Sequence, residues 1–146
     1  PELIRATLLR TGRATAEAEP FVSAAAFLHE HARAGDTVVL EPLGHIWWLN
    51  PELRFVDEVG LVSPEVARRR SRGDGWYAST VAAERPRWLV VRAGFLDRNQ
   101  PFAGRSRPFL DDAQRDSVLG AYTVVFTGDP LRVLERRTRA ATVRTP

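Results

Sequence analysis

Residues Arg54–Val66 read "RFVDEVGLVSPEV", and this stretch organises the fold that we predict for the chain. The apolar run before Gly60 is typical of a strand, which we expect over residues 54–59. Ser63 followed by Pro64 indicates the start of a helix, with serine at the N-cap and proline at the first helical position. The stretch therefore predicts a strand, an acidic turn and a helix in direct succession.

Helical and β-like patterns alternate on both sides of this stretch. The apolar residues of "PFVSAAAFLHEHARAGD" recur at helical spacing, which predicts a helix over about 20–34 that ends before Gly35. Gly73 and Gly75 divide the helical region after Ser63 into two pieces. The remaining predicted elements are strands at 37–41 and 87–93, a loop at 96–117 with a short helix near 109–117, and a hairpin of strands at 121–127 and 131–137.

Helices separate the first three predicted strands, so a parallel sheet with right-handed crossovers is the simplest topology. The expected fold is α/β, a small three-layer domain with a mostly parallel sheet and an antiparallel C-terminal hairpin at one edge. Residues 1–19 are expected to be a lead-in from an upstream segment, 20–138 a single α/β domain, and 139–146 a frayed tail. Since the sequence has no methionine, even at position 1, we expect it to be a piece of a longer protein.

Composition narrows the class of protein. Of the 146 residues, 44% are hydrophobic and 27% charged, which is typical of a soluble globular domain with a sizeable core. The absence of cysteine excludes disulfides and thiol catalysis. The net charge of +3 is small and no nucleic-acid motif is present, so we expect no nucleic-acid partner. A group of arginines is a candidate contact for anionic lipid head groups, with a solvated face as the alternative: Arg68, Arg69, Arg70 and Arg72.

The sequence carries no known cofactor motif. The glycine-rich patterns of dinucleotide and P-loop sites and the G-x-S-x-G pattern of α/β-hydrolases are all missing. His29 and His31 lie two residues apart on a predicted helix, where they face different directions, and His45 is distant in sequence. We therefore expect no cofactor and no metal site.

Polar and aromatic residues gather after the first two predicted strands, where open α/β sheets hold ligands. Glu41, His45, Trp47 and Trp48 form a candidate ligand-binding rim, in which the indole rings would stack on sugar rings and the carboxylate would accept hydroxyl hydrogen bonds. Packing of the two tryptophans in the core and its margin is the alternative. Glu41 with Asp57 would suit acid–base chemistry on a glycoside.

A structural role for Asp57 is the alternative that we favour. Short acidic side chains accept hydrogen bonds from backbone N–H groups in turns, so Asp57 is expected to fix the turn. The residues expected to build this turn are Asp57, Gly60, Ser63 and Pro64.

Residues from about Phe21 to Phe95, roughly half of the chain, resemble a known family. The segments "AAAFLHEHARAGDTVVLEPLG", "RFVDEVGLVSPEV" and "RPRWLVVRAGF" are similar to the soluble C-terminal domain of bacterial polytopic GT-C glycosyltransferases of the dolichyl-phosphate-mannose-dependent mannosyltransferase-like group. The most specific match is Val56-Asp57 with Gly60 to Glu65. The chain departs from the pattern at Trp47-Trp48 and at Glu58, where the family has other residues.

The resemblance implies an extracytoplasmic accessory domain, tethered to the membrane part of the same polypeptide, in an enzyme that uses a polyprenyl-phosphate sugar donor. The catalytic acidic residues of such enzymes lie in the membrane part, so this chain is expected to be non-catalytic. Its expected partners are that membrane part, an acceptor glycan of the cell envelope and anionic lipid head groups. An independent glycan-active enzyme using Glu41 and Asp57, or a purely structural domain, are the alternatives.

Overall fold

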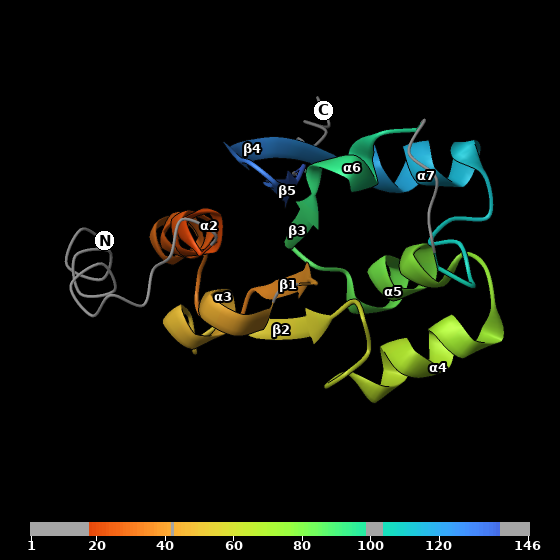
Figure 1. Cartoon of the computed structure of the whole chain (residues 1–146), viewed down its shortest axis with the longest axis horizontal. Helices are drawn as coiled ribbons and strands as arrows, with labels where there is room; N and C mark the ends of the chain where they lie inside the picture. The colour runs from red at the N-terminus through yellow and green to blue at the C-terminus, as the bar shows by residue number, and fades with distance from the viewer. Residues whose placement is uncertain (1–17, 42, 99–103, 138–146) are drawn as a thin grey trace, which may run out of the picture.

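A computed structural model describes residues 18–41, 43–98 and 104–137. These residues form a mixed α/β domain built on one five-stranded sheet with the strand order β2-β1-β3-β5-β4 (Figure 1). The strands are β1 (Thr37–Leu40), β2 (Arg54–Asp57), β3 (Trp88–Arg92), β4 (Tyr122–Gly128) and β5 (Leu131–Arg136). The helices are α2 (Glu19–His31), α3 (Leu43–Leu49), α4 (Pro64–Arg72), α5 (Trp76–Glu84), α6 (Ala93–Leu96) and α7 (Asp112–Leu119).

The described sheet is mixed in direction. Strand β1 runs parallel to both β2 and β3, whereas β5 runs antiparallel to both β3 and β4. The predicted C-terminal hairpin is therefore present, with β4 at the edge. It joins the sheet through β5, so parallel pairs do not outnumber antiparallel pairs in the described part of the chain. The direction in which the hairpin pairs with β3 could not be predicted from the sequence, because it depends on contacts between residues that are far apart along the chain.

Both faces of the central strands are buried, which explains their continuous apolar sequence. Side chains alternate in direction along a strand, so Val38 joins one core cluster and Val39 the other. In β3, Trp88 and Val90 belong to the first cluster, on the opposite face from Leu89. Figure 1 shows α2 and α3 on one side of the sheet and α4 and α5 on the other.

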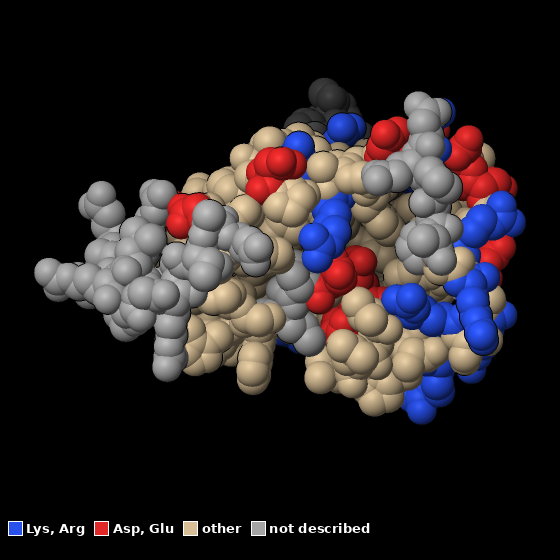
Figure 2. Space-filling model, in the orientation of Figure 1, with Lys and Arg blue, Asp and Glu red and all other residues tan. Residues whose placement is uncertain are grey.

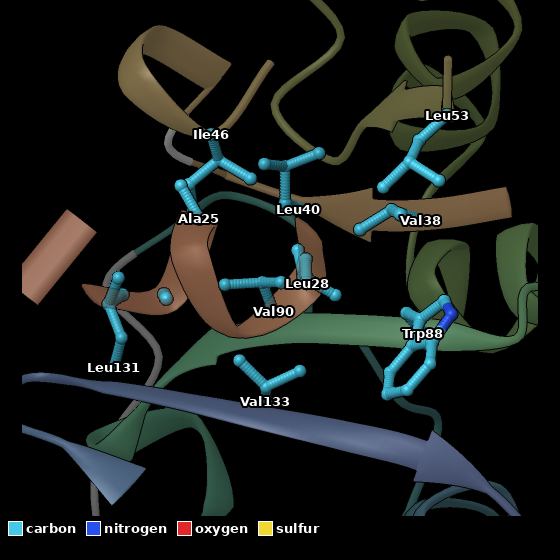
Figure 3. Packing of buried hydrophobic residues seen from close by; sticks show 11 residues of the cluster. Ala25, Leu28, Val38, Leu40, Ile46, Leu53, Trp88, Val90, Leu131 and Val133 are labelled. Carbon is cyan, nitrogen blue, oxygen red and sulfur yellow. The ribbon is translucent and has the colours of Figure 1, made fainter. Parts of the chain in front are cut away.

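The first cluster is built between the sheet and helices α2 and α3. Figure 3 shows Leu28 of α2 among side chains from β1 and β3, with Ile46 of α3 beside them. Leu28 is fully buried, so its replacement by alanine is expected to cost about 2–5 kcal/mol. The second cluster, on the other face, takes Val66 from α4 and Tyr77 from α5.

Helix α2 confirms the predicted helix but ends at His31, before the predicted boundary at 34. Ala32 already has an extended backbone, so Gly35 does not terminate the helix. Gly35 lies instead in the turn before β1, at a φ of 83°, and its N–H donates to the carbonyl of Glu52. The helical end and the glycine turn are therefore separate features.

The aromatic stretch after β1 is helical, which the sequence analysis did not predict. Helix α3 has a kink at Gly44, where φ is −7° and ψ is −107°. Ile46 is buried against α2, and Asn50, just past the helix, donates to the carbonyls of Ala25 and Ile46. These tertiary contacts stabilise a helix of seven residues, which is too short to form by propensity alone.

The other predicted elements lie close to their expected positions. Gly73 and Gly75 separate α4 from α5, as predicted. Helix α7 begins after Asp111, whose side chain accepts from the N–H of Gln114 as an N-cap. Nearly all of the expected lead-in at 1–19 and the whole expected tail at 139–146 lie outside the described residues. Among the helices of the described ranges, none combines the length and apolar character needed to span a membrane.

Candidate functional site

The three parallel strands end beside one another and place polar residues at a single edge of the sheet. Glu41 follows β1, Glu58 follows β2, and Arg92 is the last residue of β3. The connection from β1 to β2 passes through α3 on one face, while the connection from β2 to β3 passes through α4 and α5 on the other. From β1 the chain adds β2 on one side and then crosses back to add β3 on the other, so the strand order reverses at β1. Open α/β sheets bind ligands at such switch points.

A cleft of about 720 Å³ opens at this edge. Figure 2 shows acidic and basic side chains meeting around a hollow on this face of the molecule. The aromatic side chains of the cleft wall are Trp76, Phe95 and Phe109. Its charged side chains are Glu41, Glu58, Asp97, Asp129, Arg70, Arg92, Arg98 and Arg115.

Glu41 is held at the cleft by an ion pair across the sheet. Its Oε2 lies 2.5 Å from Nε of Arg92, and its Oε1 lies 3.4 Å from Nη2 of the same guanidinium. Both side chains are partly exposed, so the pair adds little to stability. Its effect is to fix two opposite charges at the mouth of the cleft.

Glu58 is the acidic residue of the cleft whose pKa is shifted most strongly. Its Oε2 is buried and has no hydrogen-bond partner among the described residues. Burial, together with the nearby negative charges of Glu41 and Asp57, raises the pKa of Glu58 to about 8 against the opposing charges of Arg70 and Arg92. At neutral pH the Glu58 carboxyl group is therefore mostly protonated and can donate a hydrogen bond.

Tyr77 lies behind the cleft and shares the environment of Glu58. Its hydroxyl is buried without a hydrogen-bond partner among the described residues, and its ring packs against Phe95 and Phe109 at 4.7 and 5.7 Å between ring centres. Burial raises the pKa of Tyr77 well above its ordinary value, and the charge of Glu58 contributes in the same direction. Tyr77 is therefore a neutral hydroxyl group in this site.

Arg70 approaches the cleft from α4. Its Nη1 donates to the backbone carbonyl of Glu58 at 3.1 Å, and its guanidinium carbon lies 4.6 Å from the centre of the Trp76 ring. The indole N–H of Trp76 donates to the carbonyl of Ser106, whose hydroxyl donates to the carbonyl of Arg70. In the described part of the chain, Arg70 makes no ion pair with a carboxylate.

The turn after β2 positions Glu58. The two carboxyl oxygens of Asp57 accept from the N–H groups of Val59 at 2.8 Å and Val62 at 3.0 Å. Gly60 has a φ of 89° and lies so close to α4 that a Cβ would come within 2.8 Å of the Ala67 nitrogen. The structure thus places Asp57 and Gly60 in the structural turn that the sequence analysis assigned to them.

Pro64 opens α4, as expected, but Ser63 does not cap it in the predicted way. The Ser63 side chain makes no cap hydrogen bond, and its hydroxyl accepts from the N–H of Asp57 instead. The backbone carbonyl of Ser63 accepts from the N–H groups of Val66 and Ala67.

The predicted ligand-binding rim is not one surface in the structure. Glu41 lines the cleft, whereas His45, Trp47 and Trp48 are not among its lining residues. The two indole side chains project from α3, and 57% of Trp47 and 68% of Trp48 is exposed. The physical reason is the unpredicted helix, which buries Ile46 and leaves Trp47 and Trp48 exposed to solvent.

The predicted arginine group is also divided. Arg69 pairs with Glu84, and Arg68 pairs with Glu65 on its own helix. Arg72 is exposed, and Arg70 alone lines the cleft. These four side chains therefore do not form one free cationic patch.

The alternative acid–base pair of Glu41 and Asp57 is not assembled at the cleft. Asp57 is only 1% exposed, both of its carboxyl oxygens bond to the turn, and it does not line the cleft. Its neighbour Glu58 lines the cleft with Glu41, as do Asp97 and Asp129. The position of Glu58 directly after a strand could have marked it as a candidate site residue. Nothing in the sequence distinguishes Arg70 from the adjacent arginines. No group of three potential metal-ligating side chains occurs within the ranges that the structure describes.

Fold and site together define a mixed α/β domain with a polar cleft at the carboxyl ends of its parallel strands. The chain belongs to the family described as Domain of unknown function (DUF8728), whose model matches residues 8–142. No curated protein and no solved structure matches the chain.

Proposed function

We propose that this chain is a non-catalytic, extracytoplasmic accessory domain of a membrane-bound glycosyltransferase with a polyprenyl-phosphate sugar donor, and that its cleft binds an acceptor glycan. The similarity of the Arg54–Val66 stretch to the GT-C group supports the first part. The observation that carries the second part is the buried, unpartnered Oε2 of Glu58 in a cleft with aromatic walls at the switch point of the sheet.

The two core clusters on opposite faces of the sheet support a three-layer arrangement of the domain. In this arrangement, helices cover both faces and leave the carboxyl edge of the parallel strands open to a ligand. The proposed partners are the membrane part of the same polypeptide and an envelope glycan. Anionic lipid head groups are a further proposed contact for the exposed Arg68 and Arg72.

A non-catalytic role agrees with the bonds that the acidic groups already make. Asp57 is committed to the turn, and Glu41 is paired with Arg92. Glycoside hydrolysis needs two carboxyl groups that are free to act on the substrate as acid and as base or nucleophile. In the cleft, only Glu58 combines a raised pKa with an oxygen that makes no hydrogen bond in the described residues.

An independent glycan-active enzyme is a second candidate, because Glu41 and Glu58 both line the cleft and the charge of Glu41 raises the pKa of Glu58. It predicts turnover by the isolated chain, which Glu58→Gln would abolish. The accessory role predicts no turnover by either protein, on any glycan that the chain binds.

The proposal is tested by titrating the ¹⁵N-labelled chain with envelope oligosaccharides while product formation is assayed in parallel. We expect the indole N–H signal of Trp76 to shift and those of Trp47 and Trp48 to stay in place. The Trp47→Ala variant is the matched control, since its side chain lies outside the cleft. Loss of binding in Trp47→Ala would show that the glycan binds at α3 rather than in the cleft. Product formation by the chain would overturn the accessory role.

A further inference from the structure

Glu58 and Arg70 both line the cleft and retain hydrogen-bonding capacity for a ligand. Glu58 carries a buried Oε2 with no partner among the described residues. Arg70 gives one N–H to the Glu58 carbonyl, lies over the Trp76 ring, and makes no ion pair in the described chain. Because both residues line the same cleft, a ligand there meets a cation and a carboxyl group together.

The other arginines of the cleft each have a carboxylate partner. Arg92 pairs with Glu41, and Arg98 pairs with Asp116. Arg115 lies 3.5 Å from Asp116 and also donates to the carbonyl of Leu96. Arg70 is thus the cleft cation that an acidic ligand can pair with without breaking an existing ion pair of the described residues.

We propose that the cleft binds an anionic oxygen group, a carboxylate or a phosphate carried on a sugar, between the guanidinium of Arg70 and the carboxyl group of Glu58. This inference rests on the proposed glycan-binding function and narrows its ligand to acidic sugars. Arg70 supplies charge and hydrogen bonds, as guanidinium groups do for carboxylate and phosphate. The aromatic wall supplies an apolar surface for the sugar ring.

The arrangement makes binding depend on pH. A bound anion favours the protonated form of Glu58, because two negative charges in a half-buried site repel each other. Affinity is therefore expected to fall as the pH rises through the pKa of Glu58, at about 8. The charged groups acting on Glu58 come from the ends of the three parallel strands and from α4: Glu41, Asp57, Arg92 and Arg70. The pKa of the nearby Tyr77 is raised by burial and in turn by Glu58 and Tyr122.

Three sugars that differ in charge test the ligand class: glucuronate, glucose 1-phosphate and glucose. Titration of the labelled chain at pH 7, followed at the Trp76 indole N–H, should give at least about tenfold tighter binding for one or both anions than for glucose. Comparing the two anions separates carboxylate from phosphate. Inorganic phosphate shows whether the sugar ring is needed.

Two cleft variants test the residues. Arg70→Gln should weaken the binding of the acidic sugar by about tenfold or more and leave glucose binding unchanged. Glu58→Gln keeps a neutral donor, so it should retain binding at pH 7 and remove the loss of affinity between pH 7 and 9. Arg33→Gln, at an exposed arginine outside the cleft, is the control and should change neither property. The melting temperature of each variant verifies that it is folded.

The outcomes separate this inference from the function on which it rests. Equal binding of glucose and both anions, or an Arg70→Gln variant that binds the acidic sugar normally, would overturn the anionic site and leave glycan binding intact. If inorganic phosphate binds but none of the three sugars does, the result would support an anion-binding cleft and argue against glycan binding. A chain that binds none of these probes would refute the anionic site.

Discussion

The backbone N–H of Asp57 donates to the hydroxyl of Ser63 at 2.9 Å, which joins the end of β2 to the start of α4. The Asp57 side chain bonds to the N–H groups of Val59 and Val62 between them. This closed set of bonds fixes the backbone on both sides of Glu58. The turn is therefore the structural support of the cleft.

Replacing Asp57 by alanine should destabilise the fold by about 2–3 kcal/mol, because two backbone N–H groups lose a charged acceptor in a buried site. Urea denaturation of the variant and the wild type measures this difference. Glu65→Ala is the matched control, since Glu65 is an exposed acid of α4 that pairs with Arg68, and its loss should cost under about 1 kcal/mol. Equal midpoints for Asp57→Ala and Glu65→Ala would show that the turn bonds contribute nothing.

Gly60→Ala should be more destabilising than Gly35→Ala, although both glycines have positive φ values, 89° and 83°. At Gly35 no atom lies within 4 Å of a new Cβ, so the cost is conformational, about 1–2 kcal/mol. At Gly60 the methyl group also meets the Ala67 backbone at 2.8 Å, which should add about 1–3 kcal/mol. Thermal unfolding of the two variants gives the comparison, and equal losses would argue against the tight contact between turn and α4.

The burial of Glu58 should make stability fall with rising pH. The folded pKa of about 8 lies above the ordinary 4.5, so the folded state binds more protons between these values. The stabilisation is complete below about pH 4.5 and is lost as the pH rises through about 8, a change on the order of 3–5 kcal/mol at 1.36 kcal/mol per pKa unit. Glu58→Gln lacks this titration.

The stability of Glu58→Gln relative to the wild type should therefore increase from pH 5 to pH 9. Urea midpoints of both proteins at the two pH values provide the measurement, and the other titrating groups cancel in the difference. Parallel pH profiles would contradict a buried, protonated Glu58.

Removing a negative and a positive neighbour of Glu58 should shift the pKa of Glu58 in opposite directions. Glu41→Gln removes a negative neighbour and should lower the pKa of Glu58, whereas Arg70→Gln removes a positive one and should raise it. Titration of the Glu58 carboxyl carbon by ¹³C NMR measures both shifts. Glu52→Gln, at an exposed acid that is not among the causes of the Glu58 shift, is the control. Shifts of the same sign in the two cleft variants would be inconsistent with the geometry described.

Local sequence patterns were sufficient to predict the elements that depend on near neighbours. The apolar runs of β1 and β3, the glycines between α4 and α5, and the acidic turn at Asp57 all act within a few residues of chain. Helix α3 was not predicted, because its seven residues are helical only when Ile46 and Asn50 contact α2. The antiparallel contact of β5 with β3 likewise depends on residues some forty positions apart.

The amino-acid sequence by itself determined where most of the strands and helices form and that Asp57 would serve a turn, since these follow from periodicity, glycine positions and short-range hydrogen bonds. Only the tertiary structure decided which charged groups share a cleft. Docking of α4 against the end of β2 brings Arg70 to the Glu58 backbone, twelve residues earlier, and burial then changes the acidity of the Glu58 carboxyl group. Such proximity and desolvation are properties of the packed chain, which no local pattern encodes.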